Sequence, residues 1–397
     1  MSHAAIERAM SVSWGRGAAD DESYWERIRA RFPLDPDLVY LNSAALGVPP
    51  DPVIAAVHEG YLRLSQDPDA GKIDYRRYND EVAIPELAAL MGARPEELAI
   101  NRNASVGLAL VADGVTGLRA GDEILTTSHE HPVGVEPWRA RAARDGLVVR
   151  EVELPSPVED AAQLIEPLRA AITGRTRVLA FCHVTRGGIR YPIEAMCRLG
   201  REHGLIIAVD GAQAIGRVPV DVTAYDCDLY AASLHKWLLA PSGTGVLYVR
   251  QEFQERFGTI TTPPGPSASR YEEEGTFDLP TRAGIGVAAA WLRQIGMGAV
   301  EARNHLLAER LRAGLAEIPG MDTVNSPKRE FVAPGTTLVV PPGGDAAGWR
   351  ARLQQGYNLR VDDHVRDGHD ALRISTHYFV SPAQVDRLID AMATEAA

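Results

Sequence analysis

Lys236 stands in an unusual sequence context for a lysine. It follows a short apolar run that is predicted to be a strand, and Trp237 and a turn-forming Pro-Ser-Gly-Thr-Gly sequence at 241–245 come after it. Lysines are normally solvated surface residues, so packing explains this position poorly. A lysine amine forms Schiff bases with carbonyl compounds and, once released, serves as a base that moves a proton. The context of Lys236 therefore indicates covalent chemistry on a carbonyl group.

Asp210 is placed where such chemistry needs a carboxylate. The apolar run Leu205–Val209 is predicted to be a buried strand with Asp210 at its carboxyl end, where open α/β sheets bind ligands. Pyridoxal phosphate (PLP) supplies a partner for this carboxylate. A carboxylate keeps the pyridine nitrogen protonated, which makes the ring an electron sink for a carbanion at the substrate α-carbon. The alternative is a helix N-cap, which the downstream Lys236 disfavours.

Short apolar runs alternate with helix-like segments from about residue 95 onward. Helical segments are predicted at 105–118, 132–144, 158–171 and 192–203. Runs predicted to be buried strands are Leu98–Ile100, Glu123–Thr127, Val148–Val152, Arg177–Cys182, Leu205–Val209, Leu229–Ala231 and Gly245–Val249. This order is typical of a mainly parallel sheet covered on both faces. We therefore expect an α/β fold with a seven-stranded sheet between helices.

The pattern changes after residue 250. A loop rich in Pro, Gly and Ser at 259–270 precedes two amphipathic helices near 283–295 and 298–318. Further strands near Thr336–Val340 and Leu372–Ser375 and a closing helix from Pro382 complete this part. We expect an N-terminal arm (1–45), a large PLP-binding domain (46–280) and a smaller α+β C-terminal domain (281–397).

The residues around Asp210 and Lys236 resemble a known family. Val209-Asp210-Gly211-Ala212-Gln213-Ala214 and Ser233-Leu234-His235-Lys236-Trp237 are similar to motifs of the class V aminotransferase group of fold-type I PLP enzymes. This group covers cysteine desulfurases, isopenicillin N epimerase-like proteins and C–S lyases, and the resemblance runs from about residue 38 to 390. It implies that Lys236 carries the cofactor, that Gln213 donates a hydrogen bond to the cofactor's phenolic oxygen, and that Ser233 and His235 bind the phosphate.

The same resemblance assigns further cofactor contacts. Ala104 and Ser105 open a predicted helix, whose free N–H groups and positive dipole end suit a phosphate. The bare sequence is more typical of a plain N-cap, and only the family resemblance favours the phosphate. His131 matches the family's histidine that stacks on the pyridine ring, whereas His129 is expected to be an exposed loop residue. Glu274-Gly275-Thr276 resembles the segment by which a second subunit sends a threonine, here Thr276, to the phosphate. The resemblance thus implies a homodimer with shared active sites.

Substrate contacts are implied nearer the chain ends. Arg373 matches the family's arginine for the substrate carboxylate, and a guanidinium fork binds a carboxylate at two points. Asn42 and Ala44, in Asn42-Ser43-Ala44-Ala45, would face Arg373 from the arm. Arg186 follows a buried strand and either binds a second acidic group of the substrate or is a solvated loop arginine.

The sequence departs from cysteine desulfurases at the residue that attacks sulfur. Their thiolate lies in a stretch of the form Arg-x-Gly-His-x-Cys, and the corresponding stretch here, at 359–366, places Val365 near the cysteine position. The cysteines, Cys182, Cys197 and Cys227, are expected to be small buried hydrophobes. Persulfide chemistry by the usual route is therefore not expected. His364, His369 and His377 are placed at the mouth of the site without assigned roles.

Composition narrows the partners. The formal net charge of −12 and pI near 5.4 disfavour nucleic acid and anionic membranes, so we expect an amino-acid-type small molecule. Cysteine spacings fit neither a metal pair nor a disulfide framework, so no metal site and a reducing cytoplasm are expected. The amino terminus has no apolar signal region, and no stretch has the roughly 20 apolar residues that span a bilayer.

The reaction is expected to pass through an α-carbanion (quinonoid) of an amino acid or amino-acid-bearing metabolite. β-Elimination, epimerisation and transamination share its first steps, and the sequence leaves the outcome open. The missing desulfurase cysteine and the epimerase-like stretch Leu41–Gly47 favour the epimerase-like branch, with a C–S β-lyase acting on a cysteine S-conjugate as the leading hypothesis. A non-catalytic PLP-sensing protein would carry a DNA-binding region before the PLP domain. This alternative is disfavoured because only about 40 residues precede the resemblance and the net charge is strongly acidic.

Overall fold

The computed structural model describes residues 14–15, 17–259, 262–272 and 275–397. Its centre is a seven-stranded sheet in the order β2-β8-β7-β6-β5-β3-β4. The strands are β2 (Leu98–Asn101), β3 (Glu123–Thr127), β4 (Val148–Val152), β5 (Thr176–Cys182), β6 (Ile206–Asp210), β7 (Leu229–Ser233) and β8 (Gly245–Val249). β8 pairs antiparallel with β7 and β2, and the other pairs are parallel. The predicted strands and the mainly parallel sheet are confirmed.

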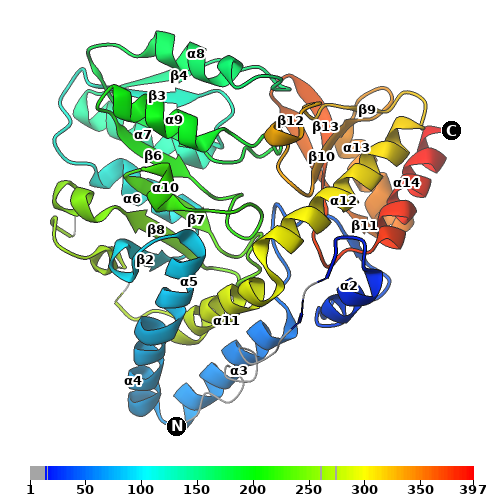
Figure 1. Ribbon diagram of the computed structural model, residues 1–397, viewed down its shortest axis with the longest axis horizontal. Helices are drawn as coiled ribbons and strands as arrows, with labels where there is room; N and C mark the ends of the chain where they lie inside the picture. The colour runs from blue at the N-terminus through cyan, green and yellow to red at the C-terminus, as the bar shows by residue number, and fades with distance from the viewer. Residues whose placement is uncertain (1–13, 16, 260–261, 273–274) are drawn as a thin grey trace.

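Helices cover both faces of this sheet (Figure 1). On one face, α6 (Ala104–Gly114) and α7 (Pro132–Asp145) form an apolar cluster with the strands. A second, larger apolar cluster contains the helices α8 (Ala162–Ala171), α9 (Ile193–Glu202) and the short α10 (Val222–Tyr225). In β6, Ile206 and Ala208 belong to the cluster that contains α6 and α7, whereas Ile207 and Val209 belong to the cluster that contains α8, α9 and α10. A strand alternates its side chains between faces, so a fully apolar run is what a sheet covered on both sides requires. β4 differs, because it is an edge strand whose residues are exposed or half-buried rather than buried.

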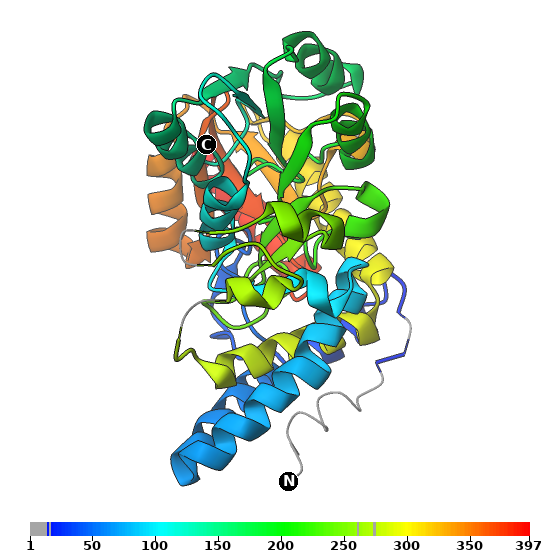
Figure 2. The ribbon, with the colours of Figure 1, turned by 90° about the vertical axis from the view of Figure 1, so that its left-hand side faces the viewer.

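Three helices precede the sheet in a region where the sequence patterns predicted none. They are α3 (Asp51–Gln66), α4 (Pro68–Tyr78) and α5 (Ile84–Met91), with a π-helical turn at Asn79–Ala83 between the last two. α3 packs along α11 (Leu279–Ile295), and Figure 2 shows α3 and α4 projecting together at one end of the molecule. Before them, α2 (Glu22–Arg29) packs beside the C-terminal part.

The C-terminal part contains a four-stranded sheet in the order β12-β13-β10-β9. Its strands are β9 (Asp322–Thr323), β10 (Thr336–Val340), β12 (Asp362–Arg366) and β13 (His369–Ser375). The helices of this part are α12 (Met297–Ala316), α13 (Ala346–Tyr357) and α14 (Pro382–Ala396). The arm joins it, because β1 (Val39–Tyr40) pairs with β11 (Leu359–Arg360) and Asn42 bridges to Ser375. The arm thus links the C-terminal strands to the central sheet.

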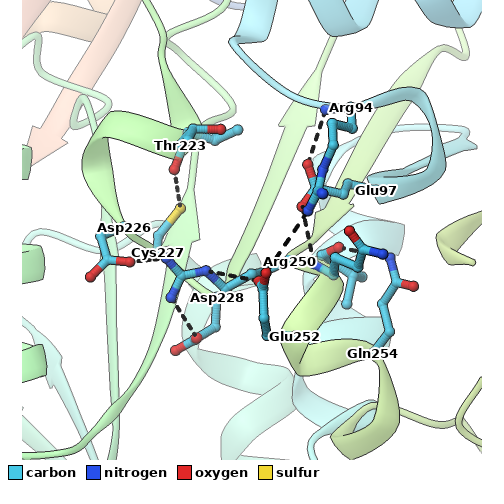
Figure 3. A network of polar contacts seen from close by, with 12 residues as sticks. Arg94, Glu97, Thr223, Asp226, Cys227, Asp228, Arg250, Glu252 and Gln254 are labelled. Carbon is cyan, nitrogen blue, oxygen red and sulfur yellow. Dashed lines mark hydrogen bonds and ion pairs between the residues drawn. The ribbon is translucent and has the colours of Figure 1, made fainter. Parts of the chain in front are cut away.

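A polar network lies at the end of the central sheet where β7 begins and β8 ends (Figure 3). The buried Asp228 precedes β7, and its Oδ1 lies 3.8 Å from Nη1 of Arg250, which follows β8. Glu97, which precedes β2, accepts a hydrogen bond of 3.0 Å from the backbone N–H of Gln251. These contacts hold the strands in place at the amino end of β7. The candidate site lies at the other end, where β6 and β7 finish.

Within the described part of the chain, no single helix is long and apolar enough to cross a membrane. Only α11 and α12 taken together reach that length and apolar character, and they are bent by 78° where they meet.

Candidate functional site

A cavity of about 70 Å³ lies at the carboxyl ends of β6 and β7. Its lining is formed by Ala104, Ser105, His131, Val133, Val184, Arg186, Asp210, Ala212, Gln213, Ser233 and Lys236. All of the polar lining residues had been predicted from the sequence, and so had Ala104. Val133, Val184 and Ala212 had not, because an apolar residue beside a cofactor carries no sequence feature that distinguishes it from a core residue.

Lys236 lies on the loop that follows β7, and its neighbours hold that loop in place. The buried Trp237 donates a hydrogen bond of 2.7 Å from Nε1 to Oε1 of Gln213, and its ring stacks on His377 with centroids 5.3 Å apart. The backbone N–H of Gly47 donates to the His235 carbonyl at 2.8 Å. Burial, assisted by the positive charges of nearby arginines, lowers the pKa of Lys236 to about 8, although Asp210 opposes this shift. At pH 7 about a tenth of the amine is therefore neutral, and hence nucleophilic.

Asp210 is the last residue of β6 and is 5% exposed. Its Oδ1 accepts a hydrogen bond of 2.8 Å from the backbone N–H of Ala212. Burial raises the pKa of Asp210, while that hydrogen bond and Lys236 act in the opposite direction. Among the described residues, the Ala212 N–H is the one hydrogen-bond donor found for this carboxylate, and it leaves Oδ2 without a donor. A buried carboxylate oriented in this way is suited to a cationic N–H group of a ligand.

Glu130 lies behind Asp210 and was not predicted. Its Oε1 accepts hydrogen bonds from the Thr127 hydroxyl at 2.8 Å and from the backbone N–H of Cys182 at 3.0 Å. Burial and the negative charge of Asp210 raise the pKa of Glu130 to about 8. Glu130 is therefore largely protonated at neutral pH, so it does not add a second full negative charge beside Asp210.

Gln213 is held at both ends of its amide. Its Oε1 accepts from Trp237, and its Nε2 donates to the Ala44 carbonyl at 2.9 Å. These contacts fix the orientation of the amide, so that the second N–H of Nε2 is free to donate elsewhere. Ala44 thus contributes its carbonyl to Gln213 and is not itself part of the cavity lining.

The amino end of α6 faces the same cavity. Asn103 caps this helix by accepting a hydrogen bond of 2.9 Å from Val106 N–H, and the Ser233 hydroxyl accepts one of 3.0 Å from Ala104 N–H. Ser105 is exposed next to them. The positive end of the helix, its N–H groups and two hydroxyl groups suit a phosphate, so the capping and phosphate-binding interpretations are compatible.

His131 and His129 take different positions. His131 lines the cavity, and its ring lies at the start of α7, where its Nδ1 accepts from Val133 N–H at 3.3 Å. Burial, followed by the positive charge of Lys236, lowers the pKa of His131 to about 4, so its ring is neutral. His129 is 3% exposed and contacts the Tyr191 hydroxyl at 2.8 Å. The expectation of an exposed His129 is therefore wrong, because its ring satisfies buried polar groups.

Arg373 lies beside the cavity without lining it. It is 2% exposed, and its Nη2 contacts Oδ2 of Asp362 and, at 3.4 Å, Oδ1 of Asn42. Arg186 lines the cavity, and its Nη2 lies 3.1 Å from the same Oδ2 of Asp362. Asn42 thus faces Arg373 as expected, and Arg186 is a half-buried cavity residue rather than a solvated one.

The remaining predicted residues lie outside the lining of this cavity. The Nδ1 of His235 lies 3.0 Å from the Thr244 carbonyl. Thr276 is exposed and lines a different hollow with Asn101 and Thr244, while Glu274 of its motif lies outside the described residues.

The histidines expected at the mouth also lie elsewhere. His377 is fully buried against Trp237, His364 is buried beside Asp367 at 3.1 Å, and the ring of His369 lies 3.3 Å from the Ser156 hydroxyl. None of them belongs to the lining described above. The buried ring of His364 contacts Asp367 of the C-terminal part, whereas Nε2 of His377 lies 3.2 Å from the Trp237 carbonyl on the Lys236 loop.

The cysteines are all buried, and none lines the cavity. Cys182 lies in β5, Cys197 in α9 and Cys227 just before β7. Burial raises the pKa of each thiol, so each is unreactive as a nucleophile. This agrees with the prediction that they are small buried hydrophobes.

The residues of this cavity fit PLP. Asp210 presents an oxygen without a protein donor, Lys236 presents an amine of lowered pKa, and the amino end of α6 presents N–H groups. A protonated pyridine nitrogen, an aldehyde and a phosphate match these three features. In the described residues, no group of three or more His, Cys, Asp or Glu side chains is arranged to bind a metal ion.

Comparisons with known proteins agree with this chemistry. The chain is 34% identical to an isopenicillin N epimerase of Amycolatopsis lactamdurans, over 93% of this chain and 98% of that one. It is 31% identical to a cysteine desulfurase of Salmonella newport, over 74% of this chain and 78% of that one. The apo structure of a cysteine desulfurase from Thermococcus onnurineus NA1 superposes with a TM-score of 0.82 at 25% identity, covering 94% of this chain and 98% of that one.

The family model for class V aminotransferases matches residues 39–388. That range includes the residues of the cavity lining and also Arg373. Enzymes of this family depend on PLP, which is the cofactor that the donor groups of the cavity fit. The chain is therefore a PLP-dependent enzyme that belongs to the class V aminotransferase family.

Proposed function

We propose that this enzyme removes the α-proton of an amino acid and then expels a thiolate from the β-carbon, as a C–S β-lyase acting on cysteine S-conjugates. The observation that carries this proposal is that the Lys236 amine and the Asp210 carboxylate share one cavity, from which all three cysteines are absent. β-Elimination needs a base at the α-carbon but no protein thiol.

The proposed roles follow from position and charge. Lys236 would hold the cofactor through its amine, and the same amine, when free, would accept the α-proton. When bound, PLP withdraws electrons from the bonds at the substrate α-carbon. Asp210 would hold the ring nitrogen, and Gln213 would donate a hydrogen bond from its fixed amide to the phenolic oxygen of the cofactor. The amino end of α6 and Ser233 would hold the phosphate, and the neutral ring of His131 would stack on the pyridine.

Epimerisation is the second candidate, because the epimerase relative is matched over nearly its whole length. Epimerisation by two bases needs a second proton donor on the substrate face opposite Lys236. The other titratable side chains that line the cavity are His131, Arg186 and Asp210. The pKa of His131 is lowered to about 4, Arg186 is paired with Asp362, and Asp210 would serve the ring nitrogen. This set of groups favours elimination.

A substrate panel tests the proposal. The purified holoenzyme is incubated with S-methyl-L-cysteine, with plain L-amino acids and with their D-enantiomers, while thiol, pyruvate, ammonia and chirality are followed. Elimination predicts methanethiol, pyruvate and ammonia in equal amounts from S-methyl-L-cysteine, and none from the Lys236→Ala variant. Inversion of chirality without thiol release would establish the epimerase instead. A keto acid formed without ammonia would establish an aminotransferase.

A further inference from the structure

Asp362 is the acidic residue that connects Arg373 to Arg186 of the cavity lining. It opens β12, and the strand register places it directly opposite Arg373 of β13. Its Oδ2 contacts Nη2 of Arg373 and lies 3.1 Å from Nη2 of Arg186, so one carboxylate oxygen bridges the two guanidinium groups. Arg186 lines the cavity and Arg373 does not.

The donors of Arg373 show what this bridge prevents. A guanidinium binds a carboxylate at two points through either Nε with Nη2 or Nη1 with Nη2, so both arrangements require Nη2. In this structure Nη2 already contacts Asp362 and, at 3.4 Å, Asn42. The Nε of Arg373 is buried and has no hydrogen-bond partner among the described residues. A two-point contact to a new carboxylate would satisfy Nε, but only if Nη2 is released.

We propose that Asp362 is a resident carboxylate that holds the acid-binding position of Arg373, so that a substrate carboxylate binds in competition with it. The proposal rests on the function proposed above, since it concerns the arginine assigned to the substrate carboxylate. Asp362 then sets the affinity and selectivity for acids, because only a ligand that outcompetes Asp362 gains both N–H groups. Arg186 keeps a hydrogen bond of 3.0 Å to the Asp363 carbonyl and can remain in place while Asp362 yields.

Asp363 supplies a matched control. It is the neighbouring aspartate on β12, and its carboxylate pairs with Arg350 at 2.7 Å rather than with Arg373 or Arg186. Asp362→Asn and Asp363→Asn therefore remove the same charge from adjacent positions. Only the first removes the bridge between the two arginines.

The test measures binding of propionate and propionamide to the holoenzyme by isothermal titration calorimetry. The two ligands have nearly the same shape and differ in the carboxylate, and neither has an α-amino group that could react. For Asp362→Asn we expect propionate to bind about tenfold tighter or more than to the wild type, with propionamide unchanged. Asp363→Asn should leave both affinities within about threefold of the wild type. Adding Arg373→Gln to Asp362→Asn should abolish the gain.

The proposal is overturned if Asp362→Asn binds propionate no better than Asp363→Asn does, since Asp362 would then only orient Arg373. It is also overturned if the gain persists without Arg373. Asp362→Ser provides the same comparison should Asp362→Asn unfold, as judged by circular dichroism. Propionate binding does not depend on chemistry at Lys236, so failure of the competition and failure of the proposed reaction are seen in separate measurements.

Discussion

Lys236 combines burial with nearby positive charge, and together they lower the pKa of its amine to about 8. Only the neutral amine attacks the cofactor aldehyde. We therefore expect the rate at which apoenzyme covalently captures PLP to rise about tenfold per pH unit up to about pH 8 and then to level off. Stopped-flow absorbance between pH 6 and 10 measures this profile.

Lys236→Ala apoenzyme is the control for that measurement, and it should show no covalent capture at any pH. A capture rate that keeps rising toward the ordinary lysine pKa of 10.5 would contradict the assigned environment of Lys236. The sign follows from the charges, because desolvation and the arginines Arg186 and Arg373 all disfavour the ammonium form.

Residues with a strong motif could be predicted from the sequence, and residues defined by tertiary pairing could not. Asp210, Gln213 and Lys236 stand in such motifs and line one cavity. Asp362 reaches Arg373 only because β12 and β13 pair in a particular register, and local sequence does not encode that register. Glu130 was missed although it precedes His131, because its significance lies in its complete burial beside Asp210.

Gly47, just after the arm, lies against the Lys236 loop, where its backbone N–H donates to the His235 carbonyl. A Cβ atom at position 47 would stand 2.0 Å from the Lys236 carbonyl oxygen and 2.8 Å from that of His235. Both contacts are with backbone, so a rotamer change cannot relieve them. We expect Gly47→Ala to displace the loop, to destabilise the protein by about 1–3 kcal/mol and to reduce turnover up to about a hundredfold.

Urea unfolding and turnover of the purified variant check this expectation. Gly174→Ala is the matched control, because Gly174 lies in an exposed turn and a Cβ there would meet nothing within 4 Å. Gly174→Ala should behave like the wild type. Normal turnover in Gly47→Ala would show that the close contact at Gly47 does not position Lys236.

At the level of elements, the sequence pattern was sufficient to predict the strands of the central sheet but not β12, α3 or α4. Apart from the edge strand β4, the strands of that sheet are largely apolar runs bounded by turns, and the positions of all seven agree with the prediction to within a few residues. β12 reads Asp-Asp-His-Val-Arg, which has no apolar alternation, and antiparallel pairing with β13 makes it a strand. α3 and α4 expose apolar residues such as Tyr61, Leu62 and Ile73, which blurs their helical pattern.

The whole molecule bears on the question of Thr276. This residue is exposed and lines a hollow that shares no described residue with the cavity of its own chain. We propose that a second subunit receives Thr276, as the family resemblance implies. Mixed subunits of Lys236→Ala and Thr276→Arg should then regain activity, because one site of each heterodimer carries neither change.

Random exchange predicts about a quarter of wild-type activity, since about half of the dimers are mixed and each has one intact site. Each variant alone must form a dimer with negligible turnover, which sedimentation and activity assays establish. A mixture that stays inactive after verified exchange would contradict the shared site. The homodimer, the domain boundaries and the cytoplasmic location stay predictions.

The most direct test of the account is to locate the cofactor on the chain. Borohydride reduction of the holoenzyme should fix the mass of PLP on the peptide that contains Lys236, as read by mass spectrometry. The sequence contains only two other lysines, Lys72 and Lys328, and both are exposed, so they serve as internal controls. We expect one reduced PLP per chain on Lys236 and none on Lys72 or Lys328. Label on Lys72 or Lys328 with Lys236 unmodified would contradict it.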